Sequence, residues 1–465
     1  MARRHSPASN PAWAGSPGHP IMPPLPRQIR LAAGDYFMHG QDRRMRRYGL
    51  PGNVCRVALR LDGGLDTDLL RRRVAASPIL NWLARVHIVR SVPLMPPRWE
   101  AATEPKTIFH EHNSAATNGS EPGSLPPAVA GRDLHAAEGP SLALDLVNHT
   151  DGSKHLVISW NHALMDARGA EFILRHLNAG DGVKDAPTVD NLINPAQQQW
   201  NLSKWWNSVK LARGSMAWLR KSGSHPLFSL MPGPRPVGPC RGQQRLISFT
   251  EAETARIDAR CQSLNAAFRR SQLYLASSIR ALHTVAQARG NKDGAYLVPV
   301  PHDMRRRGTN GPIFSNQLSI LFYRIEPRQA ASLTETITEL TRQMMNQIRD
   351  RFPEACMAAL DMFKLLPLDY YVRHLGQPTR GTFASLCFSD SGETCAGMST
   401  MLGGRITEVT HLVPTWRPPG LTVLFWSFSG RPRVLLSWVD DCLSSSEVST
   451  LEQGLRSALL EEVIT

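Results

Sequence analysis

Segments with strand-like and helix-like patterns are mixed along both halves of the chain, and this mixture limits its possible folds more than any other feature. Alternating apolar residues predict strands over residues 53–61 and 155–160, and residues 167–177 have the apolar spacing of a helix. In the second half, residues 333–349 favour an amphipathic helix and residues 421–428 a strand. Chains with both kinds of element throughout pack them in layers. The expected fold class is therefore α/β (α+β).

The same patterns predict the remaining elements. Further helices are expected over residues 66–76, 198–222, 251–263, 271–289 and 445–460. Further strands are expected over residues 141–148, 296–301, 317–324, 384–388, 406–413 and 434–439. Residues 111–129 are polar and rich in Pro and Gly, which predicts a surface loop.

The length of the chain predicts two domains. At 465 residues it is too long for one ordinary core and suits two units of roughly 200 residues each. The N-terminal half is expected over residues 26–189 and the C-terminal half over residues 244–465, with a connection over residues 190–243. Residues 1–25 are rich in Pro, Ser, Gly and Ala, which predicts a disordered tail.

The charge of the chain bears on its partners. Its formal net charge of +14 indicates attraction to an anionic partner, such as phospholipid head groups, a phosphate-bearing substrate or nucleic acid. The alternative is a basic background shared by the proteins of the host. Arginines cluster at residues 43–47, 71–73 and 305–307, but no motif that reads DNA or RNA accompanies them. We therefore expect no nucleic-acid partner.

The seven cysteines are widely spread and form no CxxC pair, which predicts free thiols in a reducing compartment. The basic residues at the start are followed by Pro, Ser, Gly and Asn and not by an apolar run, so a secretion signal is not expected. No stretch approaches the roughly 18 apolar residues of a membrane span. The expected location is the cytoplasm, either free or peripheral at the inner membrane.

His162 and Asp166 have an HxxxD spacing within residues 161–166 (NHALMD). In a chain with sixteen histidines, about one such spacing is expected by accident. This one lies between an expected strand and an expected helix, where a rigid scaffold can present a catalytic side chain. The alternative is a histidine that binds a backbone carbonyl, beside an aspartate that only caps the helix. The spacing alone favours this structural alternative.

Several other segments follow one order over nearly the whole chain after the tail. They are residues 59–63 (LRLDG) with Leu65, Asp66 and Leu69; Asp133 and Leu134 with residues 139–142 (GPSL); residues 298–305 (VPVPHDMR) with 315–317 (SNQ); and residues 388–392 (FSDSG). With residues 161–166, they resemble the condensation-domain and chloramphenicol-acetyltransferase-like superfamily. This superfamily includes the bacterial wax ester synthase/diacylglycerol acyltransferases and the condensation domains of nonribosomal peptide synthetases.

The resemblance implies two chloramphenicol-acetyltransferase-like halves, each a mixed sheet with flanking helices, and an active-site tunnel between them. Residues 161–166 resemble the HHxxxDG motif of the family, so His162 is implied to be the catalytic base. Asn161 stands where the family has its first, largely structural His, and we count Asn161 with this catalytic group. The Gly of the motif is replaced by Ala167, and Gly169 follows two positions later. Both departures put full activity in question.

The same resemblance assigns supporting residues. Asp166 is implied to turn away from the substrate and pair with a distant arginine, for which Arg305 is the matching candidate. Asn316 belongs to the matching downstream element. The oxyanion of an acyl transfer needs a hydrogen-bond donor, and Ser389 is the candidate for that role. No metal or nucleotide cofactor is implied, because no zinc spacing, P-loop or GxGxxG motif occurs.

The connection contains a tryptophan-rich segment with Trp200, Trp205, Trp206 and Trp218 among basic residues. Apolar residues between 202 and 219 fall near one helical face, although Trp218 and Leu211 lie opposite it. A helix of this kind suits the surface of a membrane or lipid droplet. Equally, it suits a linker helix that packs on the protein. The sequence leaves both interpretations open.

The resulting functional hypothesis is an enzyme that transfers an acyl group from a thioester to a hydroxyl or amine. The expected donor is acyl-CoA and the expected acceptor is lipid-like, with His162 as general base. One alternative is a condensation enzyme that takes its acyl group from a carrier protein, to which a basic surface would be suited. The other is a non-catalytic binding or scaffold protein, which Asn161 and Ala167 motivate.

Overall fold

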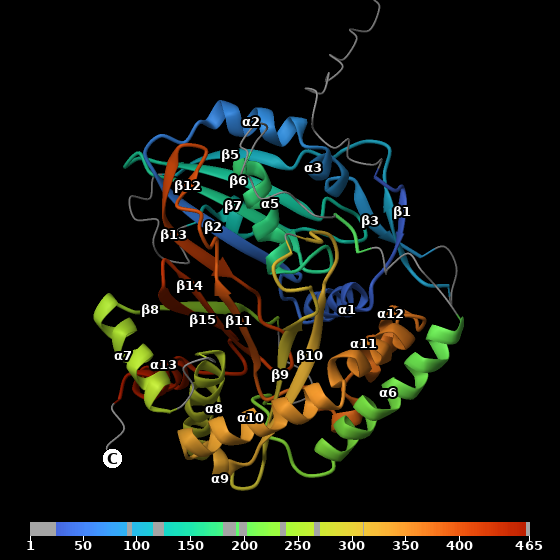
Figure 1. Ribbon diagram of the computed structural model, residues 1–465, viewed down its shortest axis with the longest axis vertical. Helices are drawn as coiled ribbons and strands as arrows, with labels where there is room; N and C mark the ends of the chain where they lie inside the picture. The colour runs from blue at the N-terminus through green and yellow to red at the C-terminus, as the bar shows by residue number, and fades with distance from the viewer. Residues whose placement is uncertain are drawn as a thin grey trace, which may run out of the picture.

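A computed structural model shows two main sheets with helices packed around them (Figure 1). The structure describes residues 25–90, 95–114, 125–179, 192–194, 202–232, 239–264, 270–309 and 311–461. The tail expected over residues 1–25 thus lies almost wholly outside the described residues, as do Trp200 and the side chain of Trp205. The α/β (α+β) class predicted from the sequence is confirmed.

The larger sheet has six strands and draws on both parts of the chain. Its strands are, in spatial order, β12 (Thr400–Met401), β13 (Gly404–Leu412), β2 (Val54–Asp62), β7 (Lys154–Asn161), β6 (Leu142–His149) and β5 (Phe109–Ser114). All neighbouring strands are antiparallel except β5 and β6, which are parallel. Because β12 and β13 come from the second half, this sheet crosses the boundary expected at residues 190–243.

The second large sheet has four strands. In spatial order they are β11 (Cys387–Glu393), β14 (Leu421–Phe428), β15 (Arg431–Val439) and β8 (Gly242–Ser248). A two-residue turn joins β14 to β15, and both of its residues, Ser429 and Gly430, have positive φ. That conformation matches the twist of the flanking strands and fixes their register.

Two smaller sheets complete the strand inventory of the described residues. They are the pair β9 (Tyr296–Asp303) and β10 (Leu318–Ile325), and the three-stranded order β1 (Gln28–Arg30), β4 (Arg98–Ala101) and β3 (Val86–Val89). Arg305 is the second residue of the loop between β9 and β10, and Asn316 and Gln317 end this loop, so the hairpin carries two of the predicted site residues.

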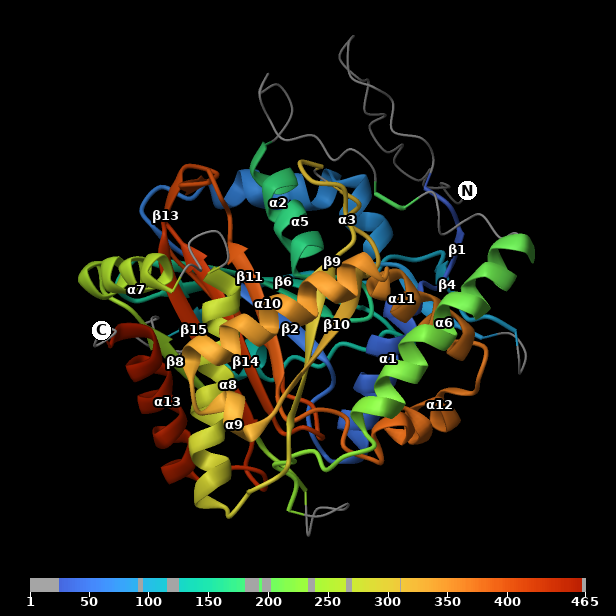
Figure 2. The same ribbon diagram turned by 60° about the horizontal axis from the view of Figure 1, so that its bottom comes forward.

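Helices cover the sheets on their outer sides (Figure 2). In the first half they are α1 (Ala33–Arg47), α2 (Thr67–Ala76), α3 (Pro78–Leu83), α4 (Pro127–Ala130) and α5 (Ala167–Ala179). The connection forms α6 (Leu202–Ser222). In the second half they are α7 (Glu251–Ser263), α8 (Arg270–Ala288), α9 (Pro327–Ala330), α10 (Leu333–Arg349), α11 (Phe352–Phe363), α12 (Leu368–His374), the 3-10 turn η3 (Gln377–Thr379) and α13 (Ser445–Leu460).

Local sequence explains several of these helix boundaries. Thr250 and Glu253 form a capping box at the start of α7, and Ser444 and Glu447 form another at the start of α13. The Asp66 side chain accepts the backbone N–H of Leu69 and begins α2. No helix in the described ranges has the length and apolar content that crossing a bilayer requires.

Some expected elements differ from the structure. Residues 109–114, whose last four residues were predicted to begin a loop, form β5, a polar edge strand paired only with β6. The strand expected over residues 384–388 begins later, at Cys387. The helix α1 was not predicted at all, because it buries polar residues such as Asp35, Gln41 and Asp42 and has no continuous apolar stripe.

The connecting helix α6 packs on the protein along its second half. Ala212, Ser215 and Met216 face α11, and Trp218 makes an edge contact with Phe352 at 5.5 Å between ring centroids. Trp218 was expected to point away from the apolar face, yet it contacts Phe322 and Phe352. Trp206, nearer the start of α6, is 58% exposed. The packed interpretation therefore applies to residues 212–219, and lipid contact through Trp206 stays a prediction.

Candidate active site

The loop that carries His162 leaves the end of β7 and enters α5. The backbone N–H of His162 donates to the Asn53 carbonyl at 2.8 Å, and the N–H of Leu164 donates to the Asn161 carbonyl at 2.8 Å. The indole N–H of Trp160 reaches forward to the Met165 carbonyl at 2.9 Å. These bonds fix both ends of the loop, so the position of His162 is set by the strand and by the helix.

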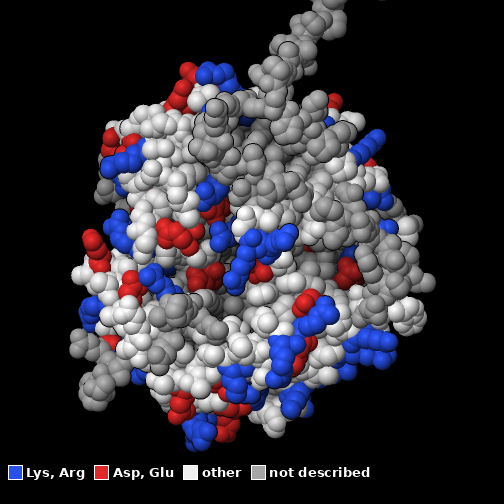
Figure 3. All heavy atoms as spheres, viewed as in Figure 1, with Lys and Arg blue, Asp and Glu red and all other residues white. Residues whose placement is uncertain are grey.

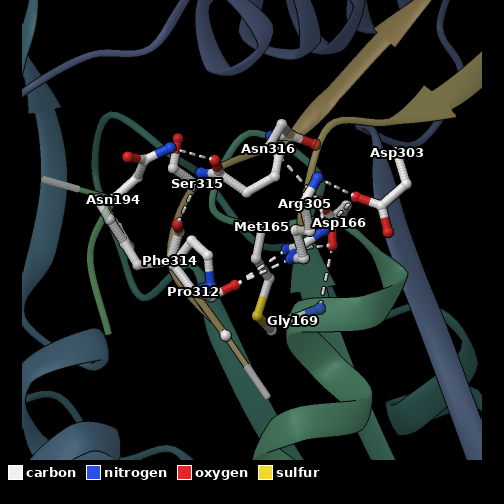
Figure 4. Close-up of polar contacts among 12 residues, drawn as sticks. Met165, Asp166, Gly169, Asn194, Asp303, Arg305, Pro312, Phe314, Ser315 and Asn316 are labelled. Carbon is white, nitrogen blue, oxygen red and sulfur yellow. Dashed lines mark hydrogen bonds and ion pairs between the residues drawn. The ribbon is translucent and has the colours of Figure 1, made fainter. Parts of the chain in front are cut away.

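A second segment, residues 312–317, lies against this loop although it is far away in the sequence (Figure 4). The N–H of Ser315 donates to the Leu164 carbonyl at 2.8 Å. The Asn316 side-chain amide donates to the His162 carbonyl at 2.8 Å and to the Ala163 carbonyl at 3.3 Å. Asn316 thus holds the backbone on which His162 is mounted.

Asp166 and Arg305 form a buried ion pair, the pairing that the family resemblance implies. The two guanidinium nitrogens of Arg305 each donate to a different carboxylate oxygen of Asp166 at 2.9 Å. Their side chains are 1% and 4% exposed. Asp166 also accepts the backbone N–H groups of Gly169 and Gln317, each at 3.0 Å. It therefore caps α5 and binds the second segment at once.

The described hydrogen bonds of Asp166 go to Arg305, Gly169 and Gln317, and none goes to the imidazole of His162. Arg305 also donates to the Pro312 carbonyl at 3.0 Å and contacts Asp303 at 3.4 Å (Figure 4). These partners satisfy the hydrogen-bonding needs of the buried carboxylate and fix its position. The geometry suits Asp166 to holding the loop and not to receiving a proton from His162.

Gly169 gives the second segment room to approach α5. A Cβ atom at this position would overlap the Ile313 carbonyl oxygen and would lie 3.0 Å from the Met165 side chain. Ala167, the first residue of α5, is partly buried and carries a Cβ of its own. The loop therefore uses its glycine at position 169, two residues beyond the position expected from the family motif.

Asn161 is fully buried, and its side chain faces the protein interior. Its amide N–H groups donate to the Asp42 carboxylate at 3.1 Å and to the Leu134 carbonyl at 2.9 Å. Its side-chain oxygen accepts the backbone N–H of Ala163 at 3.1 Å. These contacts brace the start of the loop, and an amide makes them without a second imidazole.

Asp35, on the unpredicted helix α1, is the site residue that sequence reasoning missed. Its carboxylate is fully buried and accepts the hydroxyl of Ser315 at 2.7 Å, the N–H of Asn316 at 2.7 Å and the indole N–H of Trp99 at 3.0 Å. Burial raises the pKa of Asp35, and these hydrogen bonds act in the opposite direction. The available signal was an acidic residue in the first turn of a helix, which the dipole favours.

Burial also governs the ionisation of His162. Its Nδ1 atom is buried and has no hydrogen-bond partner among the described residues, although the residue as a whole keeps some exposure. Burial lowers the pKa of His162, while its own backbone carbonyl, the nearby Asp166 carboxylate and the Asn316 side chain act in the opposite direction. The imidazole is therefore neutral at neutral pH and free to accept a proton.

Ser389 lies on β11, paired in register with Leu424 of β14. Among the described residues, no hydrogen bond joins Ser389 to the His162 loop. Its role as an oxyanion donor stays a prediction. Within the described ranges, no group of three or more His, Cys, Asp or Glu side chains is arranged to hold a metal ion.

Comparison with known proteins identifies the architecture. No protein-family profile matches the sequence, and no curated protein matches it. Solved structures do match. The trichothecene 15-O-acetyltransferase of Fusarium sporotrichioides is 13% identical, with a TM-score of 0.64 over 93% of this chain and 96% of that one. The first condensation domain of the CDA synthetase is 12% identical, with a TM-score of 0.66 over 93% and 95% of the two chains.

A third solved structure is a variant of the starter condensation domain of rhizomide synthetase in complex with C8-CoA. It is 12% identical to this chain, with a TM-score of 0.63 over 93% of this chain and 94% of that one. At these identities the likeness concerns the fold. The chain therefore has the fold of the condensation-domain and chloramphenicol-acetyltransferase-like superfamily.

Proposed function

We propose that this protein is an acyltransferase that moves an acyl group from acyl-CoA to a hydroxyl or amine of a lipid-like acceptor. The observation that supports the proposal is the set of contacts that holds His162 in place. Its loop is held by the Asp166–Arg305 pair and by the Asn316 side chain, and its imidazole remains unpaired at Nδ1 among the described residues. A neutral imidazole on a loop that two distant segments hold in place is suited to accept a proton from a substrate.

The proposed reaction uses His162 as general base and then as general acid. The neutral imidazole takes the proton of the acceptor hydroxyl or amine as the oxygen or nitrogen attacks the thioester carbonyl. A tetrahedral oxyanion forms and collapses, the carbon–sulfur bond breaks, and the thiolate takes the proton back from the imidazolium. Proton and acyl group are both accounted for, so no further reactant is needed.

Two comparisons support acyl-CoA as the donor. One similar structure is an O-acetyltransferase, and another contains C8-CoA. Condensation domains are equally similar in fold, so a carrier-bound thioester is the alternative donor. Lysine and arginine are interspersed with acidic side chains on the face shown in Figure 3, without one large basic patch on its described part. The described part of that face therefore offers no large positively charged area to which an acidic carrier protein could bind.

An acyl-CoA panel tests the proposal. The purified protein is incubated with acyl-CoAs and with alcohols or amines, and free thiol is measured. We expect acceptor-dependent thiol release that falls by about 10²- to 10⁴-fold in His162→Ala. His225→Ala removes an exposed histidine and serves as the control. Release of thiol from carrier thioesters alone would favour the carrier-dependent enzyme, and absence of turnover with every donor would favour a non-catalytic scaffold.

A lipid-like acceptor would be met at a membrane or droplet surface. Trp206 on α6 is 58% exposed, and an exposed indole favours the interface between lipid and water. We expect the protein to float with liposomes that contain anionic lipid and Trp206→Ala to float less. If neither protein floats, the proposed membrane contact is wrong. The proposed acyl transfer would then still be tested by the acyl-CoA panel.

A further inference from the structure

An apolar cavity of about 670 Å³ lies between the connecting helix and three other helices. Helices α1, α6, α11 and α12 lie side by side in both ribbon views. Six of the residues that line the cavity are Phe37, Met216, Leu219, Ala359, Phe363 and Phe383. Cavities of roughly 300–1,000 Å³ with mostly apolar walls are typical of small-molecule sites.

The described walls of this cavity carry little charge. Among the described side chains that line it, Arg220 and His374 are the only basic ones, and none is acidic. Tyr371 contributes a buried hydroxyl that has no hydrogen-bond partner among the described residues. A ligand for this space is therefore mainly hydrocarbon, with at most a few polar atoms.

The cavity and the His162 site share structural elements. Phe37 lines the cavity and follows, by two positions on α1, the Asp35 carboxylate that binds Asn316. Ile320 lines the cavity on β10, the strand that begins directly after Gln317, whose N–H binds Asp166. Thus α1 binds the second segment through Asp35, and Gln317, just before β10, binds Asp166. Both α1 and β10 form a wall of the cavity within three residues of these contacts.

We propose that this cavity binds the hydrocarbon chain of the substrate during acyl transfer. The inference rests on the proposed function and adds a substrate class to it. The chain has two possible sources, the acyl group of the thioester or the carbon skeleton of the alcohol. Both present the same chemistry to the walls, and α6, which contributes Met216 and Leu219, closes the cavity on its outer side.

A chain-length series tests the proposal. In one arm acyl-CoAs of increasing length are offered with a short alcohol, and in the other acetyl-CoA is offered with alcohols of increasing length. Each methylene that enters the cavity should raise kcat/KM by about four-fold until the cavity is full. The arm that shows this rise and break identifies the source of the chain. A flat series in both arms overturns the proposal.

Two variants and one control test whether the break in the chain-length series depends on the size of this cavity. Ala359→Leu fills part of the cavity and should move the break to chains about three carbons shorter, since leucine has three more side-chain carbons than alanine. Phe363→Ala enlarges it and should move the break to longer chains. Ala358→Leu adds the same volume at the preceding position of α11, which is buried to nearly the same extent but is not among the residues that line the cavity. It should leave the break unchanged.

These variants remain informative if one of them fails to fold. A misfolded Ala359→Leu protein leaves Phe363→Ala to decide, because loss of packing alone does not favour longer substrates. A break that stays fixed in the folded variants, or moves equally in Ala358→Leu, overturns the proposal.

A binding experiment separates this inference from the proposed function. Calorimetric titration of the His162→Ala protein with sodium decanoate needs no turnover. Saturable binding that Ala359→Leu weakens and Ala358→Leu leaves intact supports the cavity even if every acyl-CoA assay is negative. Lack of binding in the His162→Ala protein, together with turnover that ignores chain length in the parent protein, overturns the cavity and leaves the acyl transfer standing.

Discussion

Arg305 donates two hydrogen bonds of 2.9 Å to the Asp166 carboxylate, although the two residues are 139 positions apart in the sequence. The pair is almost completely buried, and it joins the start of α5 to the loop between β9 and β10. Because the same loop continues to Asn316, which binds the His162 carbonyl, the ion pair and the candidate base belong to one network. Changes in this network should therefore affect stability as well as turnover.

Removing one member of the pair should destabilise the protein strongly. Asp166→Asn or Arg305→Met leaves a buried charge without its partner, which costs about 3–5 kcal/mol. The double variant should be less destabilised than the two single effects added together, because neither charge is then left alone. Urea unfolding of the four proteins measures this coupling. Simple additivity would show that the pair contributes little beyond its separate contacts.

Gly169→Ala should destabilise the protein even though alanine favours helices. The new Cβ would overlap the Ile313 carbonyl oxygen, so α5 and residues 312–317 would have to separate, at a cost of about 1–3 kcal/mol. Gly214→Ala in α6 is the matched control, because nothing lies within 4 Å of its added Cβ. There the substitution should stabilise by about 0.5–1 kcal/mol. Thermal unfolding of both variants checks the contrast.

Much of the fold could be predicted from periodicity, and the reason is visible in particular elements. Helix α10 buries Leu333, Ile337 and Leu340 at regular helical spacing, and its predicted bounds agree with the structure. The strand β14 is buried nearly throughout and was predicted with its observed ends. In both elements the local pattern and the tertiary environment demand the same residues.

Helix α1 could not be predicted because its stability comes from contacts with distant residues. Gly34 and Gly40 weaken its intrinsic helix propensity. An added Cβ at Gly34 would lie 3.0 Å from Asn316, and one at Gly40 would lie 3.1 Å from Tyr371. These glycines are needed for close packing that no local pattern encodes. Asp35 was missed with the helix that carries it.

The candidate site also contains some contacts that could be predicted from the sequence and others that could not. The spacing of His162 and Asp166 is local and could be read in the sequence, although it did not distinguish a catalytic from a structural role. The pairing of Asp166 with Arg305 was implied only by the resemblance of two distant segments to one family. The contacts of Asp35 with Ser315 and Asn316 join segments 280 and 281 positions apart, and neither the spacing nor the resemblance pointed to them.

Asp35→Asn should lower both stability and turnover. The amide would turn N–H donors toward the Ser315 hydroxyl and the Asn316 N–H, so buried donors would face each other, at a cost of about 1–3 kcal/mol. Displacement of Asn316 would shift the His162 backbone, and we expect kcat/KM to fall by about 10- to 100-fold. Asp369→Asn removes a carboxylate that is half-exposed and serves as the surface control. Loss of stability without loss of turnover would make Asp35 a purely structural residue.

His411 should make the protein less stable in mild acid. Burial lowers its pKa to about 4, from an ordinary value of 6.5, so the folded protein keeps this imidazole neutral while the unfolded chain takes up a proton. The unfolded state then binds more protons between pH 6.5 and about 4, and stability falls as the pH falls through this window. Between pH 7 and pH 5, His411 alone should lower the free energy of unfolding by about 2 kcal/mol. His411→Gln should keep a polar contact with Thr394 and remove that part of the pH dependence. Urea unfolding of both proteins at the two pH values measures the difference, and equal losses in the two proteins would mean that other groups cause the acid sensitivity.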